Sequence, residues 1–246
     1  MVDLTFIFVG AVFVLAGIVK GVIGLGLPTI SMGLMAVVMP PVEAAAILIL
    51  PSLATNAWQM LAGPSLAPIS RRLWPMLVGG CIGTWAGIGM MTEAGARVGT
   101  ALLGAALALY GLFGLSVLRL SLRPRSECLV GALAGAVTGV ITAGTGVFVI
   151  PAVPYLQAIG LEKDELVQAM GLSFTLSTLA LAVNVGLAGA LTWSLAAPTA
   201  WALVTASLGM WIGQSVRSRL SPVAFRRWFF LGVVVLGIYL FGRSLV

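Results

Sequence analysis

Lys20 is the only charged residue deep within the first long apolar stretch of the chain, and it directly precedes Gly21. A lysine at the centre of a membrane span costs about 2.5–3.5 kcal/mol, so a residue of this kind is a candidate for function. No acidic residue stands within one helical turn to pair with Lys20. An anionic substrate would supply the missing countercharge. The alternative is that Lys20 extends to the membrane surface because the first helix ends there.

Glycine breaks interrupt the apolar sequence near the start of each half of the chain. The first covers residues 21–26 and precedes Pro28; the second covers residues 139–146 and precedes Pro151. Breaks at corresponding positions of two halves are typical of a transporter binding site. They free backbone N–H groups at half-helix ends, which bind oxyanions. The candidate ligands at these two tips are Gly24, Gly26, Thr142, Gly144, Thr145 and Gly146. The alternative is that the glycines only allow close helix packing.

Polar side chains also occur inside the third apolar segment of each half. Ser52, Asn56 and Gln59 share one helical face in the first half, and Gln168, Thr175 and Thr178 do so in the second. Amide and hydroxyl groups suit a small polar solute, so Asn56, Gln59 and Thr178 complete the predicted substrate site. The alternative is that they join helices, at about 0.6 kcal/mol per contact.

Several chemistries are excluded or disfavoured by the residues present. Without histidine, and with only Cys81 and Cys128, the chain cannot form a Cys/His metal site or a nucleophilic triad. It lacks the phosphate-loop motif that binds ATP. Glu43 follows two prolines and fits an ordinary helix start, with proton coupling as the alternative. We therefore expect no enzyme activity, no cofactor and no metal.

The composition places the chain in a membrane. Hydrophobic residues make up 60% and charged residues 8% of the sequence, and the mean hydropathy is +1.14. Apolar runs of about 20 residues match the length that spans a bilayer as a helix, and they lack the alternation of a barrel. The net charge of +6 is spread between spans and forms no nucleic-acid-binding face. We predict an all-α polytopic helix bundle.

The order of hydrophobic segments and breakers predicts two repeats in one membrane domain. The first repeat is 1–118, a linker follows at 119–126, and the second repeat is 127–246. Each should contain a broken-helix hairpin and three spanning helices, giving eight to ten membrane segments. The expected segments are 4–23, 27–39, 43–62, 73–91 and 98–118, then 127–142, 146–159, 165–190, 195–215 and 227–245.

Basic residues predict the orientation of the bundle. When each hairpin enters and leaves on the same side, one set of loops carries ten bases and the other carries only Arg97 and Arg243. By the positive-inside rule the richer set is cytoplasmic, so both termini are periplasmic, the linker is cytoplasmic and the repeats are inverted. The ten are Arg71, Arg72, Arg119, Arg123, Arg125, Lys163, Arg217, Arg219, Arg226 and Arg227.

The glycine motifs resemble those of the sulfite exporter TauE/SafE family. The resemblance rests on residues 21–28, on their repetition at 139–146 with Pro151, and on Asn56-Ala57-Trp58. It extends over essentially the whole chain, although both tips lack a fuller Gly-Gly-Gly run. It implies an inner-membrane transporter for sulfur-containing anions such as sulfite or organosulfonates.

These observations favour a transporter that moves a small anion by alternating access at a midplane site between the two hairpins. A passive anion channel and a non-transporting scaffold subunit are the alternatives, and an intramembrane enzyme ranks below both. The expected partners are a small anionic substrate and the lipid bilayer, with no nucleic acid. A homodimer is compatible with the sequence. The expected location is the cell inner membrane.

Overall fold

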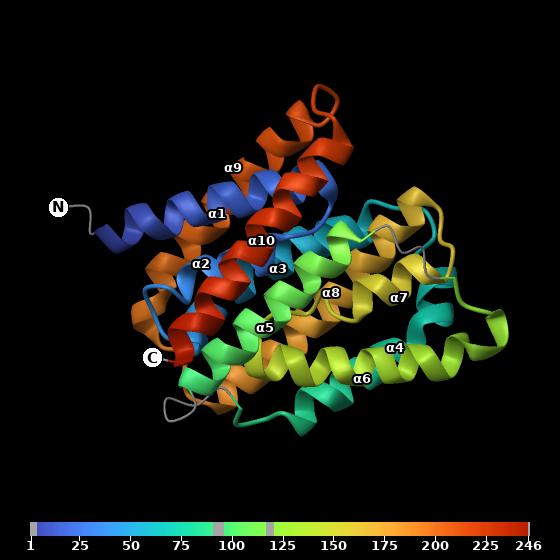
Figure 1. The fold of residues 1–246 in the computed structure, drawn as a ribbon, viewed down its shortest axis with the longest axis horizontal. Helices are drawn as coiled ribbons and strands as arrows, with labels where there is room; N and C mark the ends of the chain where they lie inside the picture. Colours follow the sequence, from blue (N-terminus) through green and yellow to red (C-terminus); the bar gives the residue numbers. More distant parts are fainter. Residues whose placement is uncertain (1–3, 91–95, 117–120, 246) are drawn as a thin grey trace.

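The computed structural model describes residues 4–90, 96–116 and 121–245. Within these ranges the chain forms α-helices and short 3-10 turns, and no strand. The first half contains α1 (Leu4–Ile23), α2 (Leu27–Met35), α3 (Pro41–Leu61), α4 (Leu66–Ala86) and α5 (Ala96–Leu115). The second contains α6 (Glu127–Thr145), α7 (Ala152–Ala158), α8 (Lys163–Leu187), α9 (Ala196–Val216) and α10 (Pro222–Leu245). The prediction of an all-α polytopic membrane protein is confirmed (Figure 1).

Seven of the described helices are long and apolar enough to cross a membrane. They are α1, α3, α5, α6, α8, α9 and α10. The helix α4 has 21 residues, a spanning length, but its apolar character is diluted by Arg71, Arg72 and several small residues. The helices α2 and α7, with 9 and 7 residues, are too short to cross. They form the second limbs of the two hairpins.

The predicted second hairpin limb, 146–159, is only partly helical. The helix α6 continues to Thr145, beyond the expected end at residue 142, and α7 begins only at Ala152. Gly146 ends α6 in the left-handed conformation, with φ of +69°, and the Ile150–Pro151 peptide bond is cis. At the first tip, Gly24 and Gly26 have φ of +80° and +109°, which a glycine adopts without strain.

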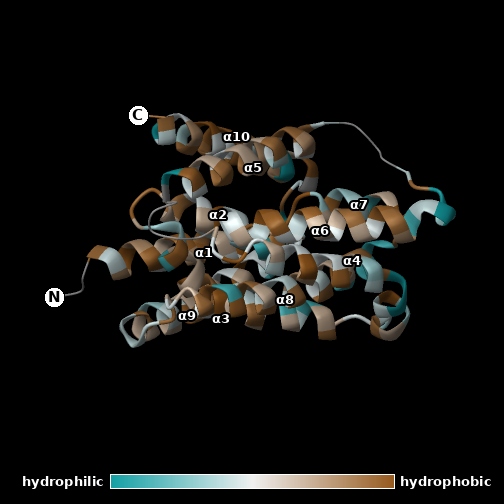
Figure 2. Ribbon diagram, turned by 90° about the horizontal axis from the view of Figure 1, so that it is seen from below, coloured by the Kyte–Doolittle hydropathy of each residue, from teal (hydrophilic) through white to brown (hydrophobic). Residues whose placement is uncertain are grey.

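Helices of the first half pack mainly on helices of the second. The principal pairs are α1 with α9, α4 with α6, α5 with α10, and α3 with α8. Figure 1 shows α4 beside α6 and α5 beside α10, and Figure 2 places α5 and α10 together as one outer layer. By their order in the two halves, α1 corresponds to α6 and α4 to α9. The α1–α9 pair and the α4–α6 pair are therefore equivalent contacts. The two halves thus form one interleaved unit.

Glycine pairs line both of these exchangeable contacts. Each glycine touches the facing helix so closely that a Cβ would strike a backbone carbonyl oxygen, so the helices pack by direct backbone contact. In both contacts the spacing is Gly-x-x-x-Gly on each helix. The glycines are Gly17 and Gly21 with Gly209 and Gly213 in the α1–α9 seam, and Gly79 and Gly83 with Gly135 and Gly139 in the α4–α6 seam.

The central helices α3 and α8 run in opposite directions along their contact. Gln168, near the start of α8, bonds the end of α3, whereas Thr178, farther along α8, meets Ser52 in the middle of α3. Glu43, near the start of α3, lines one cavity with Asn184 from the last turn of α8. Inverted halves require this antiparallel pairing of corresponding helices. Inverted symmetry of the whole fold stays a prediction.

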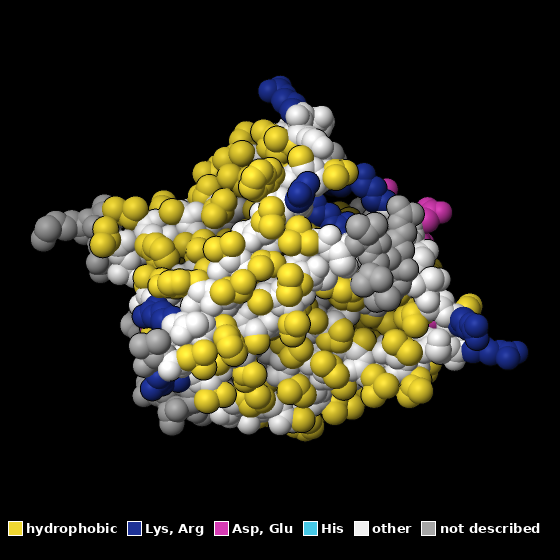
Figure 3. All heavy atoms as spheres, viewed as in Figure 1, with side chains coloured by type: hydrophobic (Ala, Val, Ile, Leu, Met, Phe, Trp, Pro, Cys, Tyr) yellow, Lys and Arg dark blue, Asp and Glu magenta, His cyan; other side chains and the backbone are white. Residues whose placement is uncertain are grey.

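The outer surface suits a lipid environment. Hydrophobic side chains cover most of the face in Figure 3, and Lys and Arg lie mainly at its margins. Large exposed apolar side chains include Trp58, Trp85, Trp193, Trp211 and Trp228. In water a patch of this size would be an aggregation hazard, but in a bilayer it is the lipid-facing surface.

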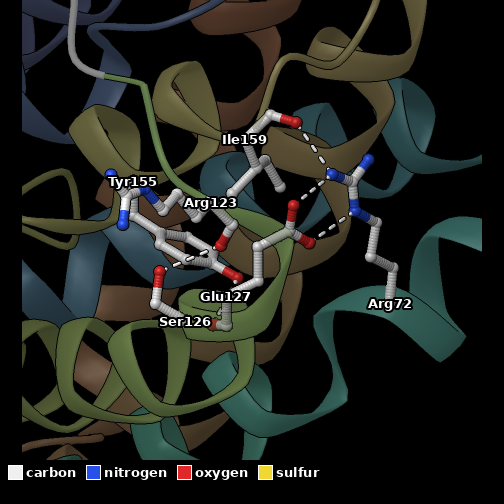
Figure 4. A network of polar contacts seen from close by, with 6 residues as sticks. All are labelled: Arg72, Arg123, Ser126, Glu127, Tyr155 and Ile159. Carbon is white, nitrogen blue, oxygen red and sulfur yellow. Dashed lines mark hydrogen bonds and ion pairs between the residues drawn. The ribbon is translucent and has the colours of Figure 1, made fainter.

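A polar clamp joins α4 to the start of α6 and to the end of the second hairpin (Figure 4). Arg72 donates from Nε to Glu127 Oε2 at 2.9 Å and from Nη2 to Glu127 Oε1 at 2.7 Å. The same Nη2 donates to Ile159 O at 2.8 Å. Tyr155 Oη donates to Glu127 O at 3.2 Å. Arg72, one of the bases predicted to be cytoplasmic, therefore holds three segments together.

Candidate functional site

Lys20 lies in the last turn of α1 and is almost wholly buried, with 2% of its surface exposed. Its Nζ donates a hydrogen bond to Oδ1 of Asn56, which is buried in the second half of α3. Among the described residues the single ion pair within 4.0 Å is that of Arg72 and Glu127, so no carboxylate of the described chain pairs with Lys20. The lysine does not extend to the surface. A neutral amide is its partner.

Asn56 is connected by hydrogen bonds to the second half of the chain. Its Nδ2 donates to Ser52 Oγ at 3.0 Å, and Ser52 Oγ lies 3.2 Å from Thr178 Oγ1 on α8. All of these groups are buried. Thr178 Oγ1 also donates to Phe174 O at 2.6 Å, so in the contact with Ser52 the serine hydroxyl donates when the threonine proton is thus engaged. The chain of bonds runs from α1 through α3 to α8.

Gln59 connects α3 to the first glycine tip. Its Nε2 donates to Gly24 O at 2.8 Å, while its buried Oε1 has no hydrogen-bond partner among the described residues. The free carbonyl of the Gly24 turn is thereby satisfied, which fixes the tip against α3. The unpartnered Oε1 remains as an acceptor beside Lys20.

A cavity of about 250 Å³ opens beside these groups, and we call it the Lys20 cavity. It lies where α1 and α3 end, α8 begins and α9 ends. Its volume is enough for a small anion and a few waters, since one water occupies about 30 Å³ in the liquid. Its polar and charged lining residues are Lys20, Gln59, Asp164, Gln168, Gln214 and Arg217.

The charges around the Lys20 cavity favour an anion inside it. Lys20 is buried at the wall, and the exposed Arg217 adds a second, solvent-screened positive charge just past the end of α9. Asp164 is the one carboxylate in the lining, and it lies in the exposed first turn of α8. A charge near solvent is screened, whereas a buried charge acts at low dielectric. The buried lysine therefore dominates the potential in the cavity.

The second glycine tip does not reach the Lys20 cavity. Thr142 Oγ1 donates to Thr138 O at 2.7 Å and Thr145 Oγ1 to Ile141 O at 2.6 Å, while Val147 N donates to Thr145 Oγ1 at 3.2 Å, so both hydroxyls are engaged locally. A Cβ at Gly144 would lie 3.3 Å from Met90 Cε, and one at Gly146 would lie 2.9 Å from Met32 Cε. Apolar side chains thus cover this tip in the conformation described.

The predicted site residues therefore fall into three groups. Lys20, Gly24 and Gln59 line the Lys20 cavity, and Asn56 and Thr178 join it through hydrogen bonds. Gly26 is packed at the first tip, where a Cβ would lie 2.9 Å from Val19 Cγ1 and 3.2 Å from Phe229. The remaining four, at the second tip, are Thr142, Gly144, Thr145 and Gly146.

Four polar or charged lining residues are not among the predicted ligands: Asp164, Gln168, Gln214 and Arg217. Gln214 and Arg217 lie one helical turn apart near the end of α9, and a polar residue just before the basic loop was the signal available in the sequence. Gln168, by contrast, has a structural role. Its Nε2 donates to Met60 O at 2.8 Å and Gly63 O at 2.7 Å, and its Oε1 accepts from Ser65 N at 2.9 Å. It caps the end of α3.

Comparison with protein-family models matches residues 9–240 to the family described as Sulfite exporter TauE/SafE. The chain belongs to the TauE/SafE family. The match includes both halves, the two glycine tips and every residue of the Lys20 cavity. Searches of curated proteins and of solved structures returned no match. Membership of the TauE/SafE family and the seven apolar helices together support a multi-pass membrane transporter of sulfur-containing anions in general terms.

Proposed function

We propose that this chain exports a small sulfur-containing anion, such as sulfite or an organosulfonate, by alternating access, and that Lys20 is the countercharge of the bound anion. One observation carries the proposal. A buried ammonium with only a neutral amide partner lies on a cavity of about 250 Å³ in a sulfite-exporter family member. An unpaired buried charge is costly, and an anion that enters the cavity removes that cost.

The oxygen atoms of such an anion would find several donors in the lining. Lys20 offers two further N–H groups beyond the one given to Asn56. Gln214 and Arg217 offer an amide and a guanidinium that matches a flat pair of oxygens. A hydrophobic solute would find no such partners. The donor set thus favours a small oxyanion over a neutral or cationic solute.

The membrane potential is sufficient to drive such export. It supplies about 2.3 kcal/mol per charge for each 100 mV, favouring anion movement out of a negative-inside cell. No coupling ion is then needed for export. Alternating access needs the Lys20 cavity to close as the opposite side opens, and the polar α3–α8 contact lies on that path.

The test is anion binding by the purified protein and by two matched lysine variants. The chain has only two lysines, the buried Lys20 and the exposed Lys163. We expect sulfite to raise the thermal unfolding midpoint, because a ligand at 100 times its Kd adds about 2.7 kcal/mol of stability. Lys20→Ala should weaken that binding at least tenfold, and Lys163→Ala should leave it unchanged.

Counterflow in proteoliposomes then separates the alternatives. A transporter gives saturable exchange of labelled sulfite against unlabelled sulfite, whereas a passive channel conducts without it and a scaffold does neither. Equal sulfite binding by wild type and Lys20→Ala would remove Lys20 from the site. The absence of any shift with sulfite, methanesulfonate, acetate and phosphate would overturn the proposal of an anion site as a whole.

A further inference from the structure

A second cavity, of about 700 Å³, lies at the other end of the α3–α8 pair, and we call it the Glu43 cavity. Residues 43 and 59 are sixteen positions apart on α3, which is about 24 Å at 1.5 Å per residue. The two cavities therefore lie toward opposite faces of a hydrocarbon layer about 30 Å thick. The polar lining residues of the Glu43 cavity are Glu43, Asn184, Thr192 and Ser194.

The Glu43 cavity is lined by the counterparts of three of the helices around the Lys20 cavity. The Lys20 cavity lies at the end of α3, the start of α8 and the end of α9. The Glu43 cavity lies at the end of α8, the start of α3 and just past the end of α4. Exchange of α3 with α8 and of α9 with α4 relates these parts of the two cavities, whereas α1 also lines the Lys20 cavity and its counterpart α6 is absent from the described lining of the Glu43 cavity. Alternating access requires a route to each face in turn, and the two cavities lie at the two ends of such a route.

Asn184 is the residue of the Glu43 cavity that points to a ligand. Its side chain is 4% exposed, and its Nδ2 has no hydrogen-bond partner among the described residues. A buried amide donor without a partner costs about 1–3 kcal/mol. Asn184 lies six residues after Thr178 on α8, about 9 Å farther along the helix toward the Glu43 end.

We propose that the Glu43 cavity is a second, weaker station for the same anion, with Asn184 Nδ2 as its donor. This proposal rests on the proposed function. No basic side chain is among the described lining residues, and the exposed carboxylate of Glu43 repels an anion in part, so the station binds weakly and releases readily. In the conformation described, the Ser52–Thr178 contact at 3.2 Å lies between the two stations and separates them.

The test measures sulfite exchange from each face of the membrane separately. Right-side-out and inside-out vesicles containing wild type give one half-saturating sulfite concentration for each face. Asn184→Leu should raise that concentration about tenfold on the face of the Glu43 cavity and change it less than twofold on the other. Glu43→Gln should lower it on the Glu43 face, because the repelling charge is gone. Val183 precedes Asn184 and is 58% exposed, so Val183→Ala is the control.

A second variant keeps the test decisive if leucine prevents folding. Asn184→Asp is nearly isosteric and replaces the donor by a carboxylate. It should therefore raise the half-saturating sulfite concentration on the Glu43 face by more than tenfold. If Asn184→Leu or Asn184→Asp leaves the half-saturating sulfite concentration unchanged on both faces, while Lys20→Ala still impairs exchange, the second station alone is overturned. An equal loss on both faces would make Asn184 a structural residue and also overturn it. Wild type without sulfite exchange would overturn the proposed function itself.

Discussion

Lys20 Nζ donates to Asn56 Oδ1, and this bond joins the last turn of α1 to the second half of α3 beside a cavity. The amide orients the ammonium without neutralising it. Asn56 is in turn fixed by its bond to Ser52. A positive charge held rigidly at the wall of a cavity is a preorganised anion site, since little reorganisation is needed when the anion binds.

Replacement of Asn56 by aspartate should abolish anion binding while keeping the shape of the site. The new carboxylate would lie within bonding distance of Lys20 and supply a permanent countercharge. We expect sulfite affinity to fall at least tenfold, or about 1.4 kcal/mol or more. The unfolding midpoint without sulfite should not fall, because a buried charge has gained a partner. Thermal shift with and without sulfite measures both quantities.

Asn56→Leu is the matched control for this change. It removes the amide from Lys20 and Ser52 alike, so the midpoint without sulfite should drop. Stable folding and wild-type sulfite affinity in Asn56→Asp would show that the charge on Lys20 does not hold the anion.

The sequence predicted the helices well because their signal is strong. Long apolar runs end at glycine, proline and charged residues, and the predicted 4–23 span agrees with α1 at both ends. The second tip was predicted less well. Residues 142–145 stay helical and Gly146 N donates to Thr142 O at 2.8 Å, a continuation of the helix that a Gly-Thr-Gly pattern does not reveal.

The composition of the candidate site was only partly accessible from the sequence. Lys20 was identifiable because an isolated charge in an apolar run is costly. Its partner Asn56 lies 36 residues away, and which of several polar faces would meet Lys20 depends on helix packing. The sequence indicates only that Arg217 helps to set the membrane orientation, because nothing in its local sequence shows that α9 ends beside α1.

The glycine seams should be the most sensitive packing contacts. Gly83→Ala would place a Cβ against the backbone of Ala136 on α6, so the α4–α6 pair would have to separate. We expect a loss of about 1–3 kcal/mol, as for other overpacked cores. Gly232→Ala on α10 meets nothing within 4 Å and should be neutral or stabilising by up to about 1 kcal/mol. Unfolding midpoints of the two variants in detergent would test this contrast. Equal midpoints would contradict the tight packing of the α4–α6 contact.

The Arg72 clamp should contribute measurably to stability although it is partly exposed. The side chains of Arg72 and Glu127 are 40% and 17% exposed, so the pair itself should couple by about 0.5–1 kcal/mol in a double-mutant cycle. Arg72→Ala should cost more than Glu127→Gln, because it also removes the bond to Ile159 O. Arg71→Ala, at the exposed neighbour, should have little effect. A larger loss in Arg71→Ala than in Arg72→Ala would contradict the role of the clamp.

The orientation prediction can be tested with two matched serine-to-cysteine changes. Ser121 and Ser194 are both exposed, the first in the linker and the second before α9. The native Cys81 and Cys128 are also exposed, so both must first be replaced by alanine. Because ten bases fall in one set of loops and two in the other, we expect Ser194→Cys to react with an impermeant thiol reagent added to intact cells. Ser121→Cys should react only after the membrane is opened. The reverse pattern would place both termini in the cytoplasm and make the Lys20 cavity face outward, so that Lys20 would bind the anion at release and not at uptake.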